Sequence, residues 1–318
     1  MGSSQSSGGM PNRISMFSSP SEDQRLRPKL FGIGSAGCSI LEGAPLPTVA
    51  LSASAADLAR SHADRKFLIG LDRLNGISGT GTDILKQLPE IVGHELLDLF
   101  NNTDMAFIMC GLGGLTGSMG SKMVASIAKA KGITSVALVT TPFSAESYRR
   151  RELVAQIMGD LVSTCSVVIE FDNDKLSSLS PNLPLSKTFG ILNSIMVRPV
   201  EDISAAMSRA DIPSFNRTLG AATHGRFGLG LGRGDERVQR AVDEALSSPW
   251  FDFDLSQVKS AIAVYSASDP WDKEAGLISD RLVERLPSAE VLFGSYADQS
   301  LADRIRLSLV VCNKPGGT

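Results

Sequence analysis

The residues best suited to chemistry are glycines grouped with hydroxyl side chains, each group placed where an apolar run ends. The longest group reads CGLGGLTGSMG from Cys110 to Gly120 and lies between an apolar run and a helical pattern. Neighbouring glycines let backbone N–H groups point toward one ligand, and the amino end of a helix adds partial positive charge. With Thr116 and Ser118 as hydroxyl donors, this segment predicts an anion-binding loop.

Two shorter glycine groups precede it: GIGSAGC at residues 32–38 and GISGTGT at residues 76–82. The first alone would fit a dinucleotide-binding fingerprint. However, the next apolar run leads into SASAA at residues 52–56, without the acidic residue that would bind a ribose. Three such loops at successive strand ends favour a nucleoside triphosphate, although the lysine pattern of a Walker A loop is absent.

Short apolar runs bounded by turn residues must position these loops. Unbroken runs of this length are typical of strands buried on both faces of a parallel sheet, and helical patterns separate several of them. Six such strands are predicted in the first part of the chain: Lys29–Gly34, Thr48–Leu51, Lys66–Gly70, Met105–Cys110, Ile133–Thr140 and Cys165–Phe171.

The pattern changes after about residue 212. A helix is predicted over residues 235–247, followed by strands at Val258–Ser266, Glu290–Tyr296 and Arg304–Cys312. The last strand alternates, which predicts a half-exposed sheet with Arg306 and its neighbours Arg304 and Ser308 on the exposed face.

These patterns predict an α/β fold with a Rossmann-like parallel sheet and a smaller α+β C-terminal domain. We expect a nucleotide-binding domain over residues 28–185, a central helix and following loop over 186–214, and the C-terminal domain over 215–318. Residues 1–27 are rich in serine, glycine and other polar residues, so we predict a disordered arm outside the fold.

Composition excludes several classes of protein. With 31 basic and 34 acidic residues among 318, the net charge of -3 argues against a nucleic-acid partner. No apolar run reaches the roughly 18 residues of a membrane span, so no direct membrane insertion is expected. Four separated cysteines without a CxxC pair, and three scattered histidines, predict no metal site and indicate reduced thiols in a cytoplasmic protein.

The glycine loop at residues 111–118 resembles the phosphate-binding loop of the tubulin/FtsZ superfamily, and further stretches resemble that family in the same order. These stretches are residues 29–39, 139–151, 171–176, 232–249 and 303–311. Over about residues 29–312 the chain is similar to the FtsZ branch, as a divergent member. The resemblance implies the tubulin/FtsZ fold and a site for GTP or GDP, with magnesium as an additional candidate.

The same resemblance implies a role for individual residues. The phosphates would be held by Gly111, Gly113, Gly114, Leu115, Thr116, Gly117 and Ser118. The two shorter loops would contribute Gly34, Ser35, Gly37, Cys38, Ser39, Gly79 and Gly81. Glu146 would accept hydrogen bonds from the ribose, with Pro142 and Arg150 beside the nucleotide. Asn173 would contact the guanine edge, while Phe189 would stack on the base one helical turn before Asn193, which would meet its polar edge.

The sequence also departs from the family pattern. Leu115 and Met119 replace small residues in the phosphate loop, which predicts a narrower pocket, and Ser39 replaces an asparagine. Ser54 replaces an aspartate near the γ-phosphate and magnesium. In the family, a loop after the central helix inserts two acids beside the nucleotide of the next subunit, whereas SRADIPSFNR at residues 208–217 contains only Asp211.

The catalytic residues therefore stay unassigned, with Asp211, Asp202 and Glu201 as candidates, and we predict slow or absent hydrolysis. The leading hypothesis is a guanine-nucleotide-binding cytoskeletal protein whose copies assemble head to tail, with another FtsZ-like protein as a further candidate partner. Two alternatives stay open. One is a non-polymerising FtsZ-like regulator of another filament, and the other is a Rossmann-type oxidoreductase, which the missing ribose-binding acid argues against.

Overall fold

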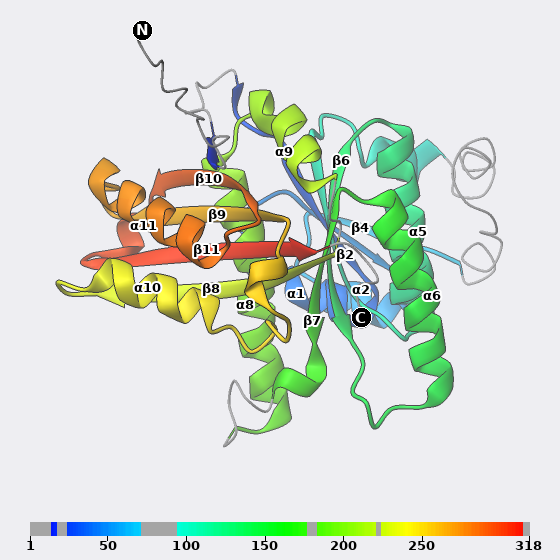
Figure 1. The fold of residues 1–318 in the computed structure, drawn as a ribbon. Coiled ribbons are helices and arrows are strands. Elements are labelled where there is room, and N and C mark those ends of the chain that lie inside the picture. The colour runs from blue at the N-terminus through cyan, green and yellow to red at the C-terminus, as the bar shows by residue number, and fades with distance from the viewer. Residues whose placement is uncertain (1–13, 18–23, 71–93, 177–182, 221–223, 314–318) are drawn as a thin grey trace, which may run out of the picture.

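A computed structural model describes residues 14–17, 24–70, 94–176, 183–220 and 224–313 (Figure 1). Within these ranges one sheet of eleven strands passes through the molecule, in the order β1-β10-β9-β11-β8-β7-β6-β5-β2-β3-β4. Helices cover both faces of the sheet (Figure 1). In the described part of the chain, no helix is long and apolar enough to cross a membrane.

The first half of the sheet is parallel, as its unbroken apolar runs predict. Its strands are β2 (Pro28–Ile33), β3 (Thr48–Ser52), β4 (Arg65–Leu68), β5 (Met105–Gly111), β6 (Thr134–Thr141) and β7 (Val167–Asp172). The helices between them are α1 (Gly34–Ile40), α2 (Ala55–Arg60), α5 (Leu115–Ala130) and α6 (Tyr148–Thr164). Because β2, β3, β5 and β6 are parallel, the loops that follow them meet at the carboxyl edge of the sheet.

The second half of the sheet contains β8 (His224–Arg233), β9 (Ser260–Ala267), β10 (Glu290–Ala297) and β11 (Arg304–Asn313). Strand β11 is antiparallel to both β8 and β9, and it lies between them. The helices α10 (Arg237–Leu246) and α11 (Asp272–Arg285) cover this half. The helix predicted at residues 235–247 and the three strands predicted after it are present, with ends that differ by a few residues at most.

Strand β8 was not predicted, because glycine occupies alternate positions where a strand normally carries large side chains. A Cβ atom placed on Gly228, Gly230 or Gly232 would lie 2.1, 1.9 or 1.8 Å from a carbonyl oxygen of α10. The backbone of α10 therefore rests directly on the backbone of β8, and only glycine leaves room for that contact.

The long helix α8 (Leu185–Ala206) connects the two halves and leads into the short η3 (Arg209–Asp211) and α9 (Ile212–Leu219). Its 22 residues correspond to a length of about 33 Å. Figure 1 shows α9 at the opposite end of α8 from the carboxyl end of β7. The apolar face of α8 belongs to a core cluster that also includes side chains from strands of both halves of the sheet.

Two predictions were wrong, one of disorder and one of exposure. Ile14–Met16 lies in the segment predicted as a disordered arm, yet it forms strand β1 and pairs in parallel with β10. On β11, Arg306 and Ser308 were predicted to be exposed, but they are 5% and 4% exposed. Alternation failed here because β11 is an inner strand, and α8 covers the face that carries its polar side chains.

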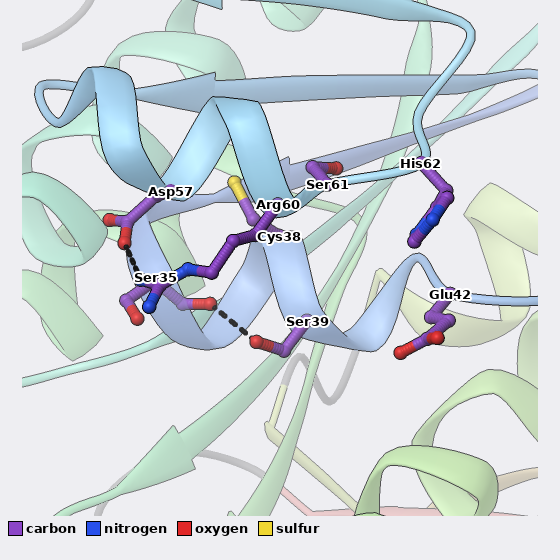
Figure 2. A pocket seen from close by; sticks show the side chains of 8 residues that line it. All are labelled: Ser35, Cys38, Ser39, Glu42, Asp57, Arg60, Ser61 and His62. Atoms are coloured by element: carbon purple, nitrogen blue, oxygen red, sulfur yellow. Dashed lines mark hydrogen bonds and ion pairs between the residues drawn. The ribbon is translucent and has the colours of Figure 1, made fainter.

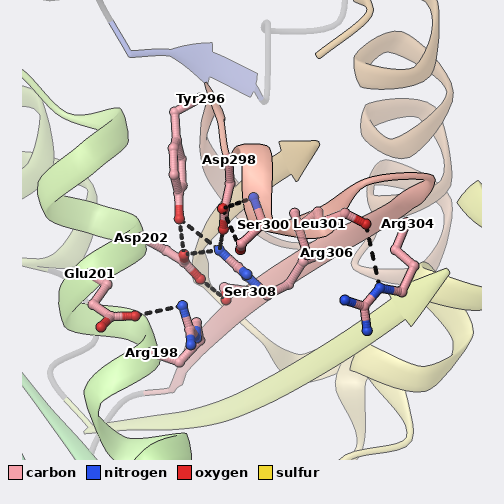
Figure 3. A network of polar contacts seen from close by, with 10 residues as sticks. All are labelled: Arg198, Glu201, Asp202, Tyr296, Asp298, Ser300, Leu301, Arg304, Arg306 and Ser308. Carbon is pink, nitrogen blue, oxygen red and sulfur yellow. Dashed lines mark hydrogen bonds and ion pairs between the residues drawn. The ribbon is translucent and has the colours of Figure 1, made fainter. Parts of the chain in front are cut away.

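A buried polar network pairs those side chains (Figure 3), although Nε of Arg306 has no hydrogen-bond partner among the described residues. Asp202 of α8 is fully buried and accepts hydrogen bonds from Arg306 at 2.9 Å, from the Tyr296 hydroxyl at 2.5 Å and from the Ser308 hydroxyl. Arg306 also contacts Asp298 at 2.9 Å. Burial, and next the adjacent Asp202 charge, raise the pKa of Tyr296, so its hydroxyl keeps the proton that it donates.

Candidate functional site

Two of the three glycine loops meet at the carboxyl edge of the sheet. Gly34 has φ +69°, and a Cβ placed on it would lie 3.2 Å from the backbone nitrogen of Gly117. A Cβ on Gly111 would lie 3.0 Å from the Cβ of Ala36. The backbones of the first and longest loops therefore approach closely, as expected where several backbone segments must surround one small ligand. Gly79 and Gly81 of the remaining loop lie outside the described residues.

The longest loop leaves the amino end of α5 free of any side-chain cap. Gly114 is the N-cap residue and makes no side-chain hydrogen bond, while Gly113 has φ +92° and donates its N–H to the Ser118 hydroxyl at 3.0 Å. Free N–H groups and the helix dipole make such an end a site for phosphate or another anion. Leu115 and Met119 were both predicted to narrow the pocket at the phosphate loop. Leu115 is 40% exposed, whereas Met119 packs against the core, so of the two only Leu115 can do so.

The predicted ribose loop lies directly beside this phosphate loop. A Cβ on Gly113 would be 3.4 Å from Pro142 Cγ and 3.6 Å from Arg150 Cβ. Glu146 accepts a hydrogen bond from the Phe143 N–H at 3.1 Å and forms an ion pair with Arg150. The Glu146 carboxylate is thus held at the edge of the site, where it already has two partners from its own loop.

The predicted base contacts lie on two elements: Asn173 follows β7, and Phe189 and Asn193 lie in the amino-terminal half of α8. Asn173 is 8% exposed, and its side-chain oxygen has no hydrogen-bond partner among the described residues. A buried amide without a partner is costly, and a bound ligand is one explanation for it. Phe189 packs edge-to-face on Phe143, with ring centroids 6.2 Å apart. Phe143 was missed from the sequence, although its place inside the predicted ribose loop was a usable signal.

Two pockets of about 380 Å³ flank α1 and contain further predicted residues. The pocket between α1 and α8 is lined by Ser39 and Asn193, so the structure brings these two distant positions together. The pocket between α1 and α2 contains Ser35, Cys38 and Ser39, with Arg60 reaching over Ser35 (Figure 2). Burial raises the pKa of the Cys38 thiol to about 11, which leaves it protonated and a poor nucleophile.

Ser54, which replaces an aspartate of the family pattern, has a different role in this structure. The Ser54 hydroxyl caps α2 by accepting the Asp57 N–H at 3.3 Å. The Asp57 carboxylate accepts from the Ser52 hydroxyl at 3.1 Å and binds Arg60 at 2.8 Å. No group of three histidine, cysteine or acidic side chains in the described ranges could hold a metal ion. Among the described residues, the Ser54 hydroxyl and the Asp57 carboxylate are therefore engaged with neighbours in their own segment.

The three candidate catalytic acids are engaged within their own chain. Asp202 belongs to the buried network under α8. Asp211 is 5% exposed and accepts hydrogen bonds from both the N–H and the hydroxyl of Ser208, closing a capping box at η3. Glu201 pairs with Arg198 at 2.5 Å, and burial raises the pKa of its carboxyl group. The geometry does not support Asp202 or Asp211 as acids presented to another subunit.

Comparison with known proteins identifies the family. The family model described as "Tubulin/FtsZ family, GTPase domain" matches residues 45–181, and "FtsZ family, C-terminal domain" matches residues 223–313. Cell division protein FtsZ 1 of Thermococcus kodakarensis is 32% identical over 305 residues, which cover 91% of this chain and 81% of that protein. This chain belongs to the tubulin/FtsZ family.

Solved structures agree with that assignment. A structure titled as an empty FtsZ dimer of M. jannaschii is 27% identical, has a TM-score of 0.78, and is matched over 92% of this chain and 89% of its own. CetZ2 of Haloferax volcanii, titled as a GTPγS-bound protofilament, is 19% identical with a TM-score of 0.72, over 92% and 94% of the two chains, and shows the same fold. The predicted tubulin/FtsZ fold is confirmed, and the oxidoreductase alternative is set aside.

Proposed function

We propose that this tubulin/FtsZ-family chain binds GTP or GDP and assembles head to tail into cytoskeletal filaments with slow GTP hydrolysis. The observation that carries the proposal is the uncapped amino end of α5, which faces the backbone of the first glycine loop. This arrangement supplies N–H donors and partial positive charge for a phosphate chain. The family assignment and the assemblies named for the solved structures support the same function.

Preference for guanine rests on the amides of Asn173 and Asn193. The side-chain oxygen of Asn173 is buried without a partner, so a base that donates an N–H to it would remove a desolvation penalty. Asn193 lines the pocket next to α1, one helical turn after Phe189. Calorimetry should show ATP binding at least about tenfold more weakly than GTP, a difference of about 1.4 kcal/mol. Equal affinities would contradict the guanine assignment.

Slow hydrolysis is inferred from the placement of the acids. An acid that orients the attacking water typically contributes about 10²- to 10⁴-fold in rate. Asp202 and Asp211 are buried and hydrogen-bonded within their own chain, and Ser54 stands where the family has a carboxylate. Nucleotide binding rests on backbone groups and amides, so it does not depend on these acids. We therefore expect binding without rapid turnover.

One experiment tests assembly and turnover together. The purified protein is sedimented and viewed by electron microscopy with GTP, with GDP and without nucleotide, while phosphate release is measured in the same samples. Filaments with GTP and little phosphate release are the expected result. Binding of GTP without filaments would favour the non-polymerising regulator. Rapid phosphate release would show that another acid, with Glu201 the first to test by alanine substitution, performs the reaction.

A further inference from the structure

Asn173, the proposed guanine contact, lies where the two halves of the sheet separate. In the described chain, strand pairing between β7 and β8 covers two residue pairs, the last of them Ile169 with Gly225. Strand β7 continues to Asp172, and the short η2 (Asn173–Lys175) begins directly after it. The end of β7 that presents Asn173 therefore extends beyond the strand pairing that joins the halves.

Trp250, from the loop that follows α10 in the second half, contacts this end of β7. Its indole Nε1–H donates to the carbonyl oxygen of Asp172 at 3.3 Å. Its ring packs edge-to-face on Phe171, with ring centroids 5.1 Å apart and an interplanar angle of 81°. Trp250 is 3% exposed, so both contacts are shielded from water. The two residues that precede Asn173 are thus held by one indole ring.

Trp250 is itself held by its own half of the sheet. The Ser248 hydroxyl donates to the carbonyl oxygen of Phe227 on β8 at 2.6 Å, and it accepts the Trp250 N–H at 3.4 Å. The Phe227 ring also packs against Phe171, with centroids 6.1 Å apart. The position of the indole is therefore set by β8, which belongs to the C-terminal half.

The loop after β7 also contacts the predicted ribose loop. The Asp172 carboxylate accepts the Asp174 N–H at 2.9 Å and so caps η2. The Asp174 carboxylate in turn accepts the Ser144 N–H at 3.1 Å. Ser144 lies two residues before Glu146, the predicted ribose contact. A continuous series of contacts thus runs from Trp250 past the base contact to the ribose loop.

We propose that Trp250 is a positioning residue for guanine selectivity, because it holds the backbone that aims the Asn173 amide at the base. This inference rests on the proposed function and deepens it, by assigning base selectivity in part to a residue outside the nucleotide-binding half. The Asn173 side-chain oxygen is buried without a partner among the described residues. Guanine presents N–H donors at N1 and N2, where adenine presents an acceptor and a C–H.

A fixed acceptor discriminates between these two bases better than a movable one. A site built to hydrogen-bond one ligand rejects an analogue that lacks the matching group, because the buried polar atom is then left unpaired. If the acceptor could turn aside, the wrong base would escape that penalty. The contacts of Trp250 with Phe171 and Asp172 oppose such a movement of the Asn173 backbone.

The test measures GTP and ATP affinities of unassembled protein by calorimetry for the wild type and two variants. Trp250→Phe keeps an aromatic ring against Phe171 but removes the N–H donated to Asp172. Trp271→Phe is the matched control, because it makes the same change at a tryptophan that is 56% exposed. We expect Trp250→Phe to weaken GTP binding about fivefold, the effect of one hydrogen bond, and ATP binding less than about twofold. The control should leave both affinities unchanged.

A double variant tests whether Trp250 acts through Asn173. When Trp250→Phe is added to Asn173→Ala, the ratio of GTP affinity to ATP affinity should stay as it is in Asn173→Ala alone, because the positioned acceptor is already gone. Residues that act through one another are non-additive in this way, whereas independent residues add. Additive losses of selectivity would overturn the inference.

The possible results separate this inference from the proposed function. A wild type that binds GTP and ATP equally would overturn the guanine preference and this inference with it. A wild type that prefers GTP, beside a Trp250→Phe variant with an unchanged preference or with equal losses for both nucleotides, would overturn the inference alone. Equal losses would mean that Trp250 supports only the fold.

Tryptophan emission decides the matter if Trp250→Phe does not fold. The chain has two tryptophans, so Trp250 is the only one left in Trp271→Phe. Its emission should change when GTP binds and stay the same at equal occupancy by ATP, because only guanine engages the loop that the indole holds. Unchanged emission with GTP, or the same change with ATP, would overturn the inference.

Discussion

Replacing Asp202 by alanine should destabilise the protein more than any change to its exposed ion pairs. The Asp202 carboxylate accepts from Arg306, Tyr296 and Ser308 in a region that is almost fully buried. Breaking a buried ion pair costs about 3–5 kcal/mol, since the remaining charge keeps its desolvation penalty without its partner. Because Arg306 retains Asp298 at 2.9 Å, we expect the lower end of that range, about 3 kcal/mol.

Thermal unfolding with GTP absent measures this effect. At about 2 °C per kcal/mol for a chain of this size, a loss of about 3 kcal/mol lowers the melting temperature by about 6 °C. The matched control is Asp303→Ala, which removes an ion pair with Arg233 whose side chains are 60% and 73% exposed. That control should lower stability by less than about 1 kcal/mol.

A double variant tests the reasoning independently. If Asp202→Ala is combined with Arg306→Met, no unpaired arginine remains under α8, and replacing a buried ion pair by apolar side chains is often nearly neutral. The double variant should therefore lose less stability than the two single variants added together, by at least about 1 kcal/mol. Strict additivity, or a loss below about 1 kcal/mol for Asp202→Ala alone, would refute the view that this network stabilises α8 on the sheet.

Three further predictions follow from the site and the fold. Asn173→Ala should weaken GTP binding about tenfold while changing ATP binding little, because only guanine is proposed to satisfy that amide; calorimetry with both nucleotides checks it. Gly230→Ala should prevent native folding, since its Cβ would lie 1.9 Å from a carbonyl oxygen of α10. Gly276 lies in α11 with open space around its Cβ position, so Gly276→Ala should stabilise that helix by up to about 1 kcal/mol. Thermal melts followed by circular dichroism compare the two variants. Cys38, with its pKa raised to about 11 by burial, should resist iodoacetamide at pH 8 until the protein is unfolded, and rapid labelling of native protein would contradict its burial.

The sequence predicted the parts of the fold that depend on local composition. Apolar runs located the parallel strands, and glycine clusters located two loops whose backbones approach each other in the structure. The family resemblance placed Phe189 and Asn193 one helical turn apart on the central helix, but only the fold shows that Ser39 of α1 lines the same pocket as Asn193. The edge-to-face packing of Phe189 on Phe143 likewise depends on how α8 meets the β6–α6 loop.

Sequence patterns gave wrong predictions of exposure and secondary structure where contacts between distant residues override local preference. Alternation on β11 indicated an exposed face, because an arginine such as Arg306 is usually solvated, and nothing nearby shows that Asp202, 104 residues away, will pair with it. Asp211 was a candidate catalytic acid, although Ser208 three residues earlier is the usual partner for a capping box. Ile14–Met16 lies in a polar segment, and only its pairing with β10 makes it a strand.

The contact between β8 and α10 has a consequence for how substitutions are tolerated along one strand. Because the backbones touch, the spacing between helix and strand is set by atoms that no side chain can change. Positions 228, 230 and 232 should accept glycine alone, while Leu229 is half-buried and Leu231 is 41% exposed on the other face. If every residue of β8 were substituted in turn, the loss of stability should therefore alternate with a period of two along the strand. The largest losses should fall at the glycines, which a hydrophobicity scale would rank as least important.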